Sequence, residues 1–288
     1  MADKHIILIT GANTGLGLEV VKALHKSDVT YEIILGSRSV DKANEAIATV
    51  KQESQTSKSN LSSVEVDVTS DDSIRKAFEH VKSQHGRLDT LVNNAGASFD
   101  HAASQGKMTL REAFNAAWDV NVSGTHVITH EFAPLLLKSA DPRLMFVTSG
   151  TSALAETEQF DYPPLARLNA SPEAGWPKSS MTPVTSYRSS KTGLNMVMRE
   201  WAKILKNDGV KVFAISPGFL ATGLAGVGAE QLKKVSNVHE RHDSSITYAP
   251  QMGALDPSEG GSFIRDVVEG KRDHDQGKAI RATMVQPW

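Results

Sequence analysis

The sequence contains no cysteine in its 288 residues. A disulfide framework, a thiolate nucleophile and a cysteine-ligated zinc site are therefore excluded. The histidines form no His-Glu-x-x-His motif, and no Gly-x-Ser-x-Gly turn presents a nucleophilic serine. We expect no bound metal. Because a chain without cysteine suits a reducing compartment, we expect the protein in the cytoplasm.

An excess of charge of one sign is also lacking. The 31 basic and 33 acidic residues give a formal net charge of -2. No overall field would therefore gather nucleic acid or an anionic membrane surface. No apolar segment approaches the length needed to span a bilayer, and no export leader precedes the first strand-like run. We expect neither a nucleic-acid nor a membrane partner.

Short apolar runs alternate with helical patterns along the chain. The runs lie at residues 5–10, 32–36, 64–68, 88–92, 143–147 and 210–215, with a last strand expected around 278–285. Helical patterns begin near residues 15, 41, 73, 109 and 187. Nearly continuous apolar runs are typical of parallel strands covered on both faces, and intervening helices imply right-handed crossovers. We predict a single-domain α/β protein over 1–288: a Rossmann fold with a doubly wound, mostly parallel sheet of about seven strands.

Two stretches interrupt this alternation. Residues 54–63 are polar and serine-rich, which predicts a surface loop before the third strand. Residues 151–186 contain five prolines and several aromatic residues. That segment is too irregular for a standard crossover and too apolar for a free linker, so we predict an insert there.

A glycine-rich turn joins the first predicted strand to the first helix. It reads Thr10-Gly11-Ala12-Asn13-Thr14-Gly15-Leu16-Gly17, with the spacing Gly-x-x-x-Gly-x-Gly. Glycines permit a tight turn and close approach of the backbone, while the helix N-terminus offers free N–H groups to an anion. A strand, a glycine turn and a helix in this order predict a site for a dinucleotide pyrophosphate.

The helix near residue 187 carries two polar residues on an apolar face. Leu194, Val197, Met198, Trp201 and Leu205 repeat at helical spacing, and the same stripe reaches back to Lys191 and Tyr187. Four residues apart, the ammonium and the phenol lie one above the other. A cation beside a phenol favours the phenolate and so suits proton transfer. The alternative for the pair alone is an ordinary tyrosine and a snorkelling lysine.

Taken together, these motifs resemble those of the short-chain dehydrogenases/reductases. The resemblance covers nearly the whole chain and keeps the family's order. It is carried by the Thr-Gly-x-x-x-Gly-x-Gly turn, Asn93-Asn94-Ala95-Gly96, Asn121, Ser149, Tyr187-x-x-x-Lys191, Pro217-Gly218 and Thr222.

The resemblance implies a nicotinamide cofactor site. Its expected residues are Gly11, Asn13, Thr14, Gly15, Leu16 and Gly17 at the phosphates, Asp67 and Val68 at the adenine, Asn94 and Gly96 beside the ribose, Pro217, Gly218, Leu220 and Thr222 near the nicotinamide, and Tyr187 with Lys191, of which the lysine also reaches the ribose. Asp67 could instead cap a strand end.

Arg38 follows the second strand, where the family distinguishes the two nicotinamide cofactors. A basic residue there meets a 2′-phosphate with charge-assisted hydrogen bonds, so we predict NADP(H). Many NADP-specific relatives also carry a basic residue in the glycine turn, where this chain has Thr14. Arg38 could alternatively be an ordinary surface arginine.

The resemblance also implies four catalytic residues: Asn121, Ser149, Tyr187 and Lys191. Tyr187 is expected to transfer the proton, with its pKa lowered by Lys191 and by the oxidised nicotinamide. Ser149 is expected to hold the substrate oxygen, although Thr148 or Ser152 could take that part. Asn121 is expected to order water leading to Lys191, or else to be a mere helix irregularity.

The insert indicates the substrate. Ser149 and Tyr187 lie 38 positions apart. This arrangement resembles the family's carbonyl reductases, in which such an insert covers the substrate end of the cleft and can block subunit pairing. We therefore expect a monomer, with a substrate lid at 223–250. Its apolar residues could form a wall for a bulky hydrophobic ketone or aldehyde, or could only pin the insert to the body: Phe160, Tyr162, Leu165, Trp176 and Met181.

The expected function is NADP(H)-dependent reduction of such a small-molecule carbonyl to an alcohol. Three alternatives stay open: a cofactor-binding regulator without turnover, a dehydrogenase working in the oxidative direction, and a sugar-nucleotide epimerase. The glycine spacing argues against the epimerase, and the full set of proton-transfer residues argues against the regulator.

Overall fold

The computed structural model describes residues 4–161, 163–178, 184–225 and 254–288. In these residues one sheet of seven strands has the order β3-β2-β1-β4-β5-β6-β7, and every pair of neighbours is parallel. The strands are β1 (His5–Thr10), β2 (Tyr31–Ser37), β3 (Asn60–Glu65), β4 (Thr90–Asn93), β5 (Arg143–Val147), β6 (Lys211–Ile215) and β7 (Ala279–Ile280). The order reverses between β1 and β4, which in such sheets opens a ligand crevice at the carboxyl ends of the strands.

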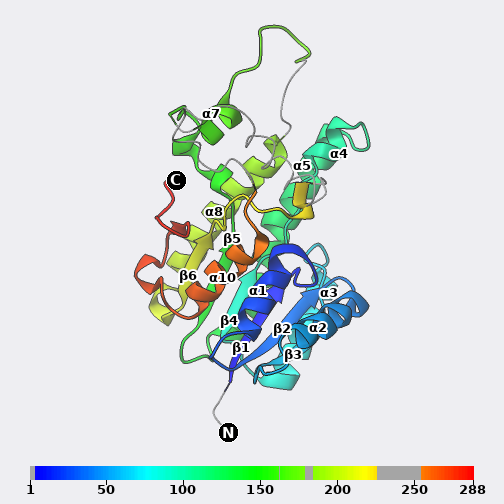
Figure 1. The fold of residues 1–288 in the computed structure, drawn as a ribbon, viewed down its shortest axis with the longest axis vertical. Helices are drawn as coiled ribbons and strands as arrows, with labels where there is room; N and C mark the ends of the chain where they lie inside the picture. Colours follow the sequence, from blue (N-terminus) through cyan, green and yellow to red (C-terminus); the bar gives the residue numbers. More distant parts are fainter. Residues whose placement is uncertain (1–3, 162, 179–183, 226–253) are drawn as a thin grey trace, which may run out of the picture.

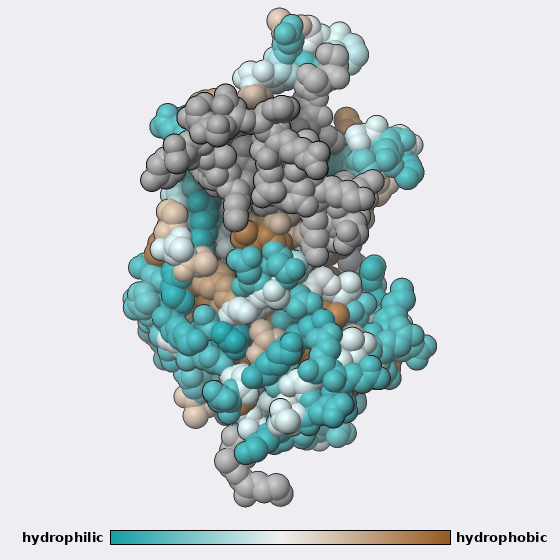
Figure 2. Space-filling model, in the orientation of Figure 1, coloured by the Kyte–Doolittle hydropathy of each residue, from teal (hydrophilic) through white to brown (hydrophobic). Residues whose placement is uncertain are grey.

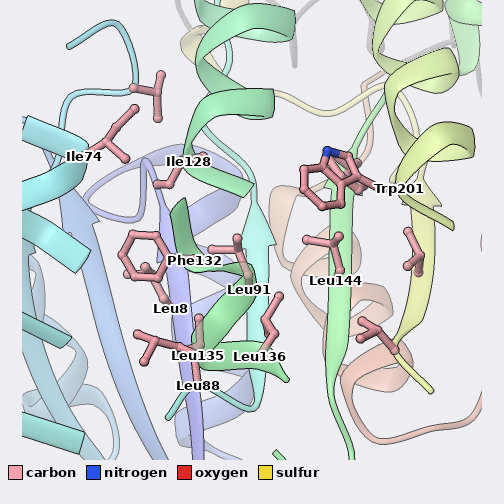
Figure 3. Close-up of a cluster of buried hydrophobic side chains, with 14 of the residues drawn as sticks. Leu8, Ile74, Leu88, Leu91, Ile128, Phe132, Leu135, Leu136, Leu144 and Trp201 are labelled. Carbon is pink, nitrogen blue, oxygen red and sulfur yellow. The ribbon is translucent and has the colours of Figure 1, made fainter. Parts of the chain in front are cut away.

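Helices cover both faces of the sheet (Figure 1). Side chains of α1 (Gly15–His25), α2 (Val40–Glu53) and α10 (Pro257–Val268) share one apolar cluster with inward residues of β1, β2 and β6. On the opposite face, α3 (Asp71–His85), α6 (Thr125–Leu136) and α8 (Thr185–Ile204) share a second cluster. In Figure 3, Ile128 and Phe132 of α6 pack towards Leu8 and Leu91 of the sheet. Each side chain buried in this way contributes about 1.5–3 kcal/mol.

The connection from β4 to β5 is helical for most of its length. After α4 (Asp100–Ser104), a capping box of Thr109 and Glu112 starts α5 (Leu110–Trp118). A π-helical turn, η1 (Asp119–Gly124), then joins α5 to α6. The helical region predicted over 109–138 is therefore one helical stretch with a single wide turn inside it.

The Rossmann fold and its seven parallel strands are confirmed, but two boundary predictions are wrong. The last strand, expected around 278–285, is only Ala279–Ile280. The polar stretch predicted as loop supplies the first residues of β3, because Asn60–Glu65 pairs along β2. This strand lies at the sheet edge and is only partly buried, so serines can occupy it.

The structure describes most of the predicted insert at 151–186 but little of the predicted lid at 223–250. Residues of the insert form η2 (Gly150–Ser152), η3 (Leu154–Glu156) and α7 (Pro163–Asn169). Most of the predicted lid lies outside the described residues. No helix within the described ranges is long and apolar enough to cross a membrane.

Candidate active site

The glycine turn leaves the carboxyl end of β1 and enters α1 without a side-chain cap. Thr14 occupies the N-cap position but makes no capping hydrogen bond, and the first turn of α1 contains no acidic residue. A Cβ at Gly17 would overlap the carbonyl oxygen of Gly11 and the side-chain nitrogen of Asn94. The N-terminus of α1 therefore has no side-chain cap, and no side chain at Gly17 separates the helix from the turn. Such a helix N-terminus fits a bound phosphate group.

Asn94 fastens this turn to the end of β4. Its Nδ2 donates to the carbonyl oxygens of Thr10 at 2.8 Å and Gly11 at 3.2 Å. The Thr10 hydroxyl accepts in return from the backbone amides of Asn94 and Ala95. The Asn94 side chain is therefore used inside the protein, and a contact with the ribose stays a prediction.

The loop after β6 meets the same turn. The Thr222 side chain lies against Gly15, while Pro217 and Leu220 pack with Leu16 around Gly260 of α10. The structure thus brings residues predicted at the phosphates together with residues predicted at the nicotinamide.

Beyond β2, Arg38 is exposed and has no hydrogen bond or ion pair within the described part of the chain. The preceding Ser37 donates from its hydroxyl to Asn13 Oδ1 at 3.1 Å, which ties the end of β2 to the glycine turn. Asp67 accepts from both the amide and the hydroxyl of Thr69 through Oδ1. That turn-capping role is the alternative left open from the sequence, and contact of Asp67 with an adenine stays a prediction.

Tyr187 lies in the first turn of α8 and is half-buried as a residue. Burial of its hydroxyl raises the pKa of Tyr187 to about 12, and the Ser149 hydroxyl acts in the opposite direction. The sequence led us to expect that Lys191 and the oxidised nicotinamide would both lower the pKa of Tyr187. In the structure the pKa shift is upward, because desolvation dominates and the Lys191 Nζ lies 5.9 Å from the ring centroid.

Lys191 is buried, with 3% of its surface exposed. Its Nζ donates to the carbonyl oxygen of Val147 at 2.8 Å, and no carboxylate in the described residues pairs with it. Desolvation therefore lowers the pKa of Lys191 to about 8. A Cβ at Gly96 would lie 3.2 Å from this Nζ, so the Asn-Ala-Gly loop passes directly beside the ammonium.

Asn121 lies inside the π-helical turn and is fully buried. Its Oδ1 accepts from Ala97 N at 2.9 Å, and its Nδ2 donates to Ala97 O at 2.8 Å and to Ser190 Oγ at 2.9 Å. The helix irregularity expected at this asparagine is therefore a π-turn, a feature that often marks functional sites. It connects the Asn-Ala-Gly loop to α8.

Ser149 follows β5 and is more exposed than the two nearby hydroxyl residues, Thr148 and Ser152. Its hydroxyl is half-buried and lies 3.0 Å from that of Thr151. Thr148 is buried and bonded to Asn195 Oδ1 at 2.6 Å, while the buried Ser152 hydroxyl donates to Ser149 O at 2.6 Å. Both alternative hydroxyls are thus used in internal contacts.

The sequence left open whether the apolar side chains of the insert form a substrate wall or pin the insert to the body, and two of them are largely exposed. Trp176 is 86% exposed and Phe160 is 56% exposed. Leu165 is partly buried, while Tyr162 and Met181 lie outside the described residues. On the face of the molecule drawn in Figure 2, apolar atoms lie near the middle and the surface below them is mostly hydrophilic.

Two supports of the site were not predicted from the sequence. The carboxylate of Asp100 accepts from the backbone amides of Ser186 and Tyr187. Behind Ser149, Gln286 Nε2 donates to the Ser149 carbonyl oxygen at 3.1 Å, and Arg281 pairs with the buried Glu156. These contacts join residues that lie 86 to 137 positions apart in the sequence, so no local sequence motif predicts them.

A helical pair of histidines, His126 and His130, has a spacing that can hold a metal and was not predicted as a site from the sequence. In the structure His126 Nδ1 accepts from Trp201 Nε1 at 3.2 Å. No group of three or more metal-ligating side chains occurs in the described ranges.

Most of the chain matches one known protein family. The family profile for short chain dehydrogenases matches residues 5–163 and 169–233. The chain belongs to the short-chain dehydrogenase/reductase family. It is 46% identical over 290 residues to the short-chain dehydrogenase/reductase eupG of Phoma sp, covering 99% of this chain and 98% of that protein. It is 41% identical over 289 residues to tropE of Talaromyces stipitatus, covering 100% and 99%.

Solved structures share the fold at low identity. An NADPH-bound carbonyl reductase from chicken fatty liver superposes with a TM-score of 0.71 at 20% identity, covering 99% of both chains. An actinorhodin polyketide ketoreductase with NADPH gives a TM-score of 0.72 at 18% identity, covering 98% of this chain and 96% of that one. The family makes this protein an oxidoreductase with a nicotinamide cofactor.

Proposed function

We propose that this oxidoreductase uses NADPH to reduce a bulky, hydrophobic ketone or aldehyde to an alcohol in the cytoplasm. One observation carries the proposal: the buried ammonium of Lys191, which no carboxylate in the described residues pairs with, lies 5.9 Å from the ring centroid of the half-buried Tyr187. It also lies beside Gly96, in the loop that Asn94 binds to the glycine turn. A buried ammonium without a countercharge is costly, and such groups concentrate at functional sites.

When bound, the cofactor supplies the hydride that reaches the carbonyl carbon. Tyr187 protonates the carbonyl oxygen through its hydroxyl. Burial raises the pKa of Tyr187, so its hydroxyl carries a proton near neutral pH and can donate it to the carbonyl oxygen as negative charge develops there. The neighbouring Ser149 hydroxyl orients the same oxygen, a part for which the buried Thr148 and Ser152 hydroxyls are not free.

Lys191 stabilises the phenolate left on Tyr187 after the proton has moved. Its ammonium is near, desolvated and not neutralised by an acid in the described residues, so its field at the phenol is little screened. Asn121 holds the loop beside this ammonium through Ala97 and holds α8 through Ser190.

NADP(H) is favoured over NAD(H) by Arg38. Its exposed guanidinium follows β2 at the edge of the predicted adenosine site and has no other partner in the described chain. Such a side chain is free to bind a 2′-phosphate in a planar, bidentate contact.

The direct test is consumption of NADPH by the purified protein over a panel of ketones and aldehydes of increasing size, with the alcohol identified by mass spectrometry. We expect turnover with large apolar carbonyls and more than a hundredfold less with the Tyr187→Phe variant. Tight NADPH binding without turnover of any carbonyl or alcohol would instead support a cofactor-binding regulator. Turnover only with alcohols and NADP⁺ would support a dehydrogenase.

A further inference from the structure

The catalytic helix α8 has no capping side chain of its own. Its N-cap residue is Val184, which makes no side-chain capping hydrogen bond. The first amides of a helix have no partner within the helix and need an acceptor from elsewhere. In α8 those amides include the backbone N–H of Tyr187 itself.

Asp100 supplies that acceptor from a distant part of the chain. Its Oδ1 accepts from Ser186 N at 2.9 Å, and its Oδ2 accepts from Tyr187 N at 2.9 Å and from Ser186 Oγ at 2.8 Å. Asp100 is buried, with 7% of its surface exposed. A carboxylate at a helix N-terminus interacts favourably with the helix dipole as well as with the amides.

Asp100 also belongs to the segment that passes the predicted cofactor site. Three positions before it, Ala97 is bound through both backbone groups by Asn121, whose Nδ2 reaches Ser190 on α8. At the start of the segment, Asn94 binds the glycine turn. Residues 94–100 therefore connect the turn to α8 at two points, Ser190 and the amide of Tyr187.

We propose that Asp100 is a positioning residue for Tyr187: its buried carboxylate holds the first turn of α8 and so fixes the phenol relative to the loop at residues 94–97. Asp100 acts through the backbone of Tyr187 and not on the reacting atoms. Its role in turnover rests on the proposed function, because only an enzyme that exchanges hydride between a nicotinamide and its substrate needs this phenol aligned with that cofactor.

The Asp100→Asn variant tests the proposal at constant side-chain size. Its amide has one oxygen, so whichever way it turns, one of the two backbone N–H groups faces an NH2 group that cannot accept. We expect kcat to fall about ten- to hundredfold, since misplacing a reacting group by about 1 Å can cost a hundredfold. The NADPH dissociation constant should stay within about threefold, because the glycine turn is untouched.

Two matched controls separate positioning from general destabilisation. Ser70→Ala removes the hydroxyl that caps α3 by accepting from Ser73 N at 3.3 Å. It should lower the thermal midpoint but leave kcat unchanged. Ser186→Ala removes only the hydroxyl contact to Asp100 and keeps both amide hydrogen bonds, so its kcat should stay within about threefold of wild type.

Hydrogen–deuterium exchange of the peptide over 184–190 provides a readout that needs no substrate. We expect faster exchange at the amides of Ser186 and Tyr187 in Asp100→Asn, and no change there in Ser70→Ala. If Asp100→Asn does not fold, Asp100→Ser, whose single hydroxyl oxygen replaces the two carboxylate oxygens, should also show faster exchange at these amides and a lower kcat than wild type.

The proposal is overturned if Asp100→Asn keeps the wild-type kcat, if exchange at these amides does not change, or if Ser70→Ala loses as much kcat at an equal thermal midpoint. A wild-type protein that reduces no carbonyl would instead refute the proposed function. In that case the exchange measurement still decides whether Asp100 holds Tyr187.

Discussion

Replacing Lys191 by methionine should stabilise the ligand-free protein while abolishing its activity. Lys191 is 3% exposed, and its Nζ has one hydrogen-bond partner in the described residues, the carbonyl oxygen of Val147. Methionine has a similar length, fills irregular space in a core and carries no charge to desolvate. The substitution therefore removes an unfavourable charge burial without opening a large cavity.

The magnitude follows from the pKa of the lysine. Desolvation lowers that pKa from 10.5 to about 8, and one pKa unit corresponds to about 1.36 kcal/mol. Burying the ammonium thus costs the folded state about 3 kcal/mol near neutral pH. Loss of the hydrogen bond to Val147 offsets about 1.5 kcal/mol of this. We expect a net gain of about 1–2 kcal/mol, or a few degrees in the thermal midpoint.

The sign of the pH dependence provides an independent check. Between pH 8 and 10.5 the unfolded chain keeps a proton on Lys191 that the folded chain has lost, so the stability of the wild type should rise with pH there. The raised pKa of Tyr187 opposes this only above pH 10, where the unfolded phenol begins to ionise first. The informative window is therefore pH 8 to 10.

Urea denaturation of both proteins at pH 7 and at pH 9.5 measures these quantities. We expect the methionine variant to be more stable at pH 7 and its advantage to shrink at pH 9.5, with turnover and NADPH binding impaired at both. A variant less stable than wild type by 1 kcal/mol at pH 7, or an advantage independent of pH, would refute the reasoning. A gain would indicate that the lysine is retained for function at a cost in stability.

Three further predictions concern chemistry, cofactor and assembly. Tyr187→Phe should lower kcat by roughly a hundred- to ten-thousandfold with nearly unchanged NADPH binding, because only the proton donor is removed; wild-type turnover would contradict the assignment. Arg38 should give roughly a ten- to hundredfold preference for NADPH in kcat/KM, and Arg38→Asp should reduce or invert it, whereas an unchanged ratio would mean that another residue binds the phosphate. Sedimentation at micromolar concentration should find a monomer, and a stable dimer or tetramer would overturn the expectation drawn from the insert.

The sheet was predictable because its strands are buried on both faces. Near-continuous apolar runs such as Ile6–Ile9 are found in the sequence directly, and they became the central strands. The edge strand β3 was placed too late because Asn60 and the serines after it have the composition of a loop, and only pairing with β2 makes them a strand. Helix α10 was not predicted, although Asp256 before Pro257 is a recognisable helix start.

Within the site, residues on the pattern of one helix or turn were predictable, and the contacts between segments were not. The stripe through Leu194 predicted that Lys191 is buried, which the structure bears out. It did not predict that Val147 would bind the ammonium, or that Asp100 and Gln286 would hold the segments carrying Tyr187 and Ser149. Such contacts depend on the tertiary arrangement of the chain, which local periodicity does not specify.

The most direct test of the central claim is transfer of deuterium from NADPH labelled at C4 of the nicotinamide to a large ketone, followed by mass spectrometry of the alcohol. We expect one deuterium at the new carbinol carbon with the wild type, on one face of the carbonyl only, and no product above background with Tyr187→Phe. Alcohol formed without deuterium from either face of the labelled cofactor, or equal amounts of labelled alcohol from Tyr187→Phe, would contradict hydride transfer assisted by this phenol.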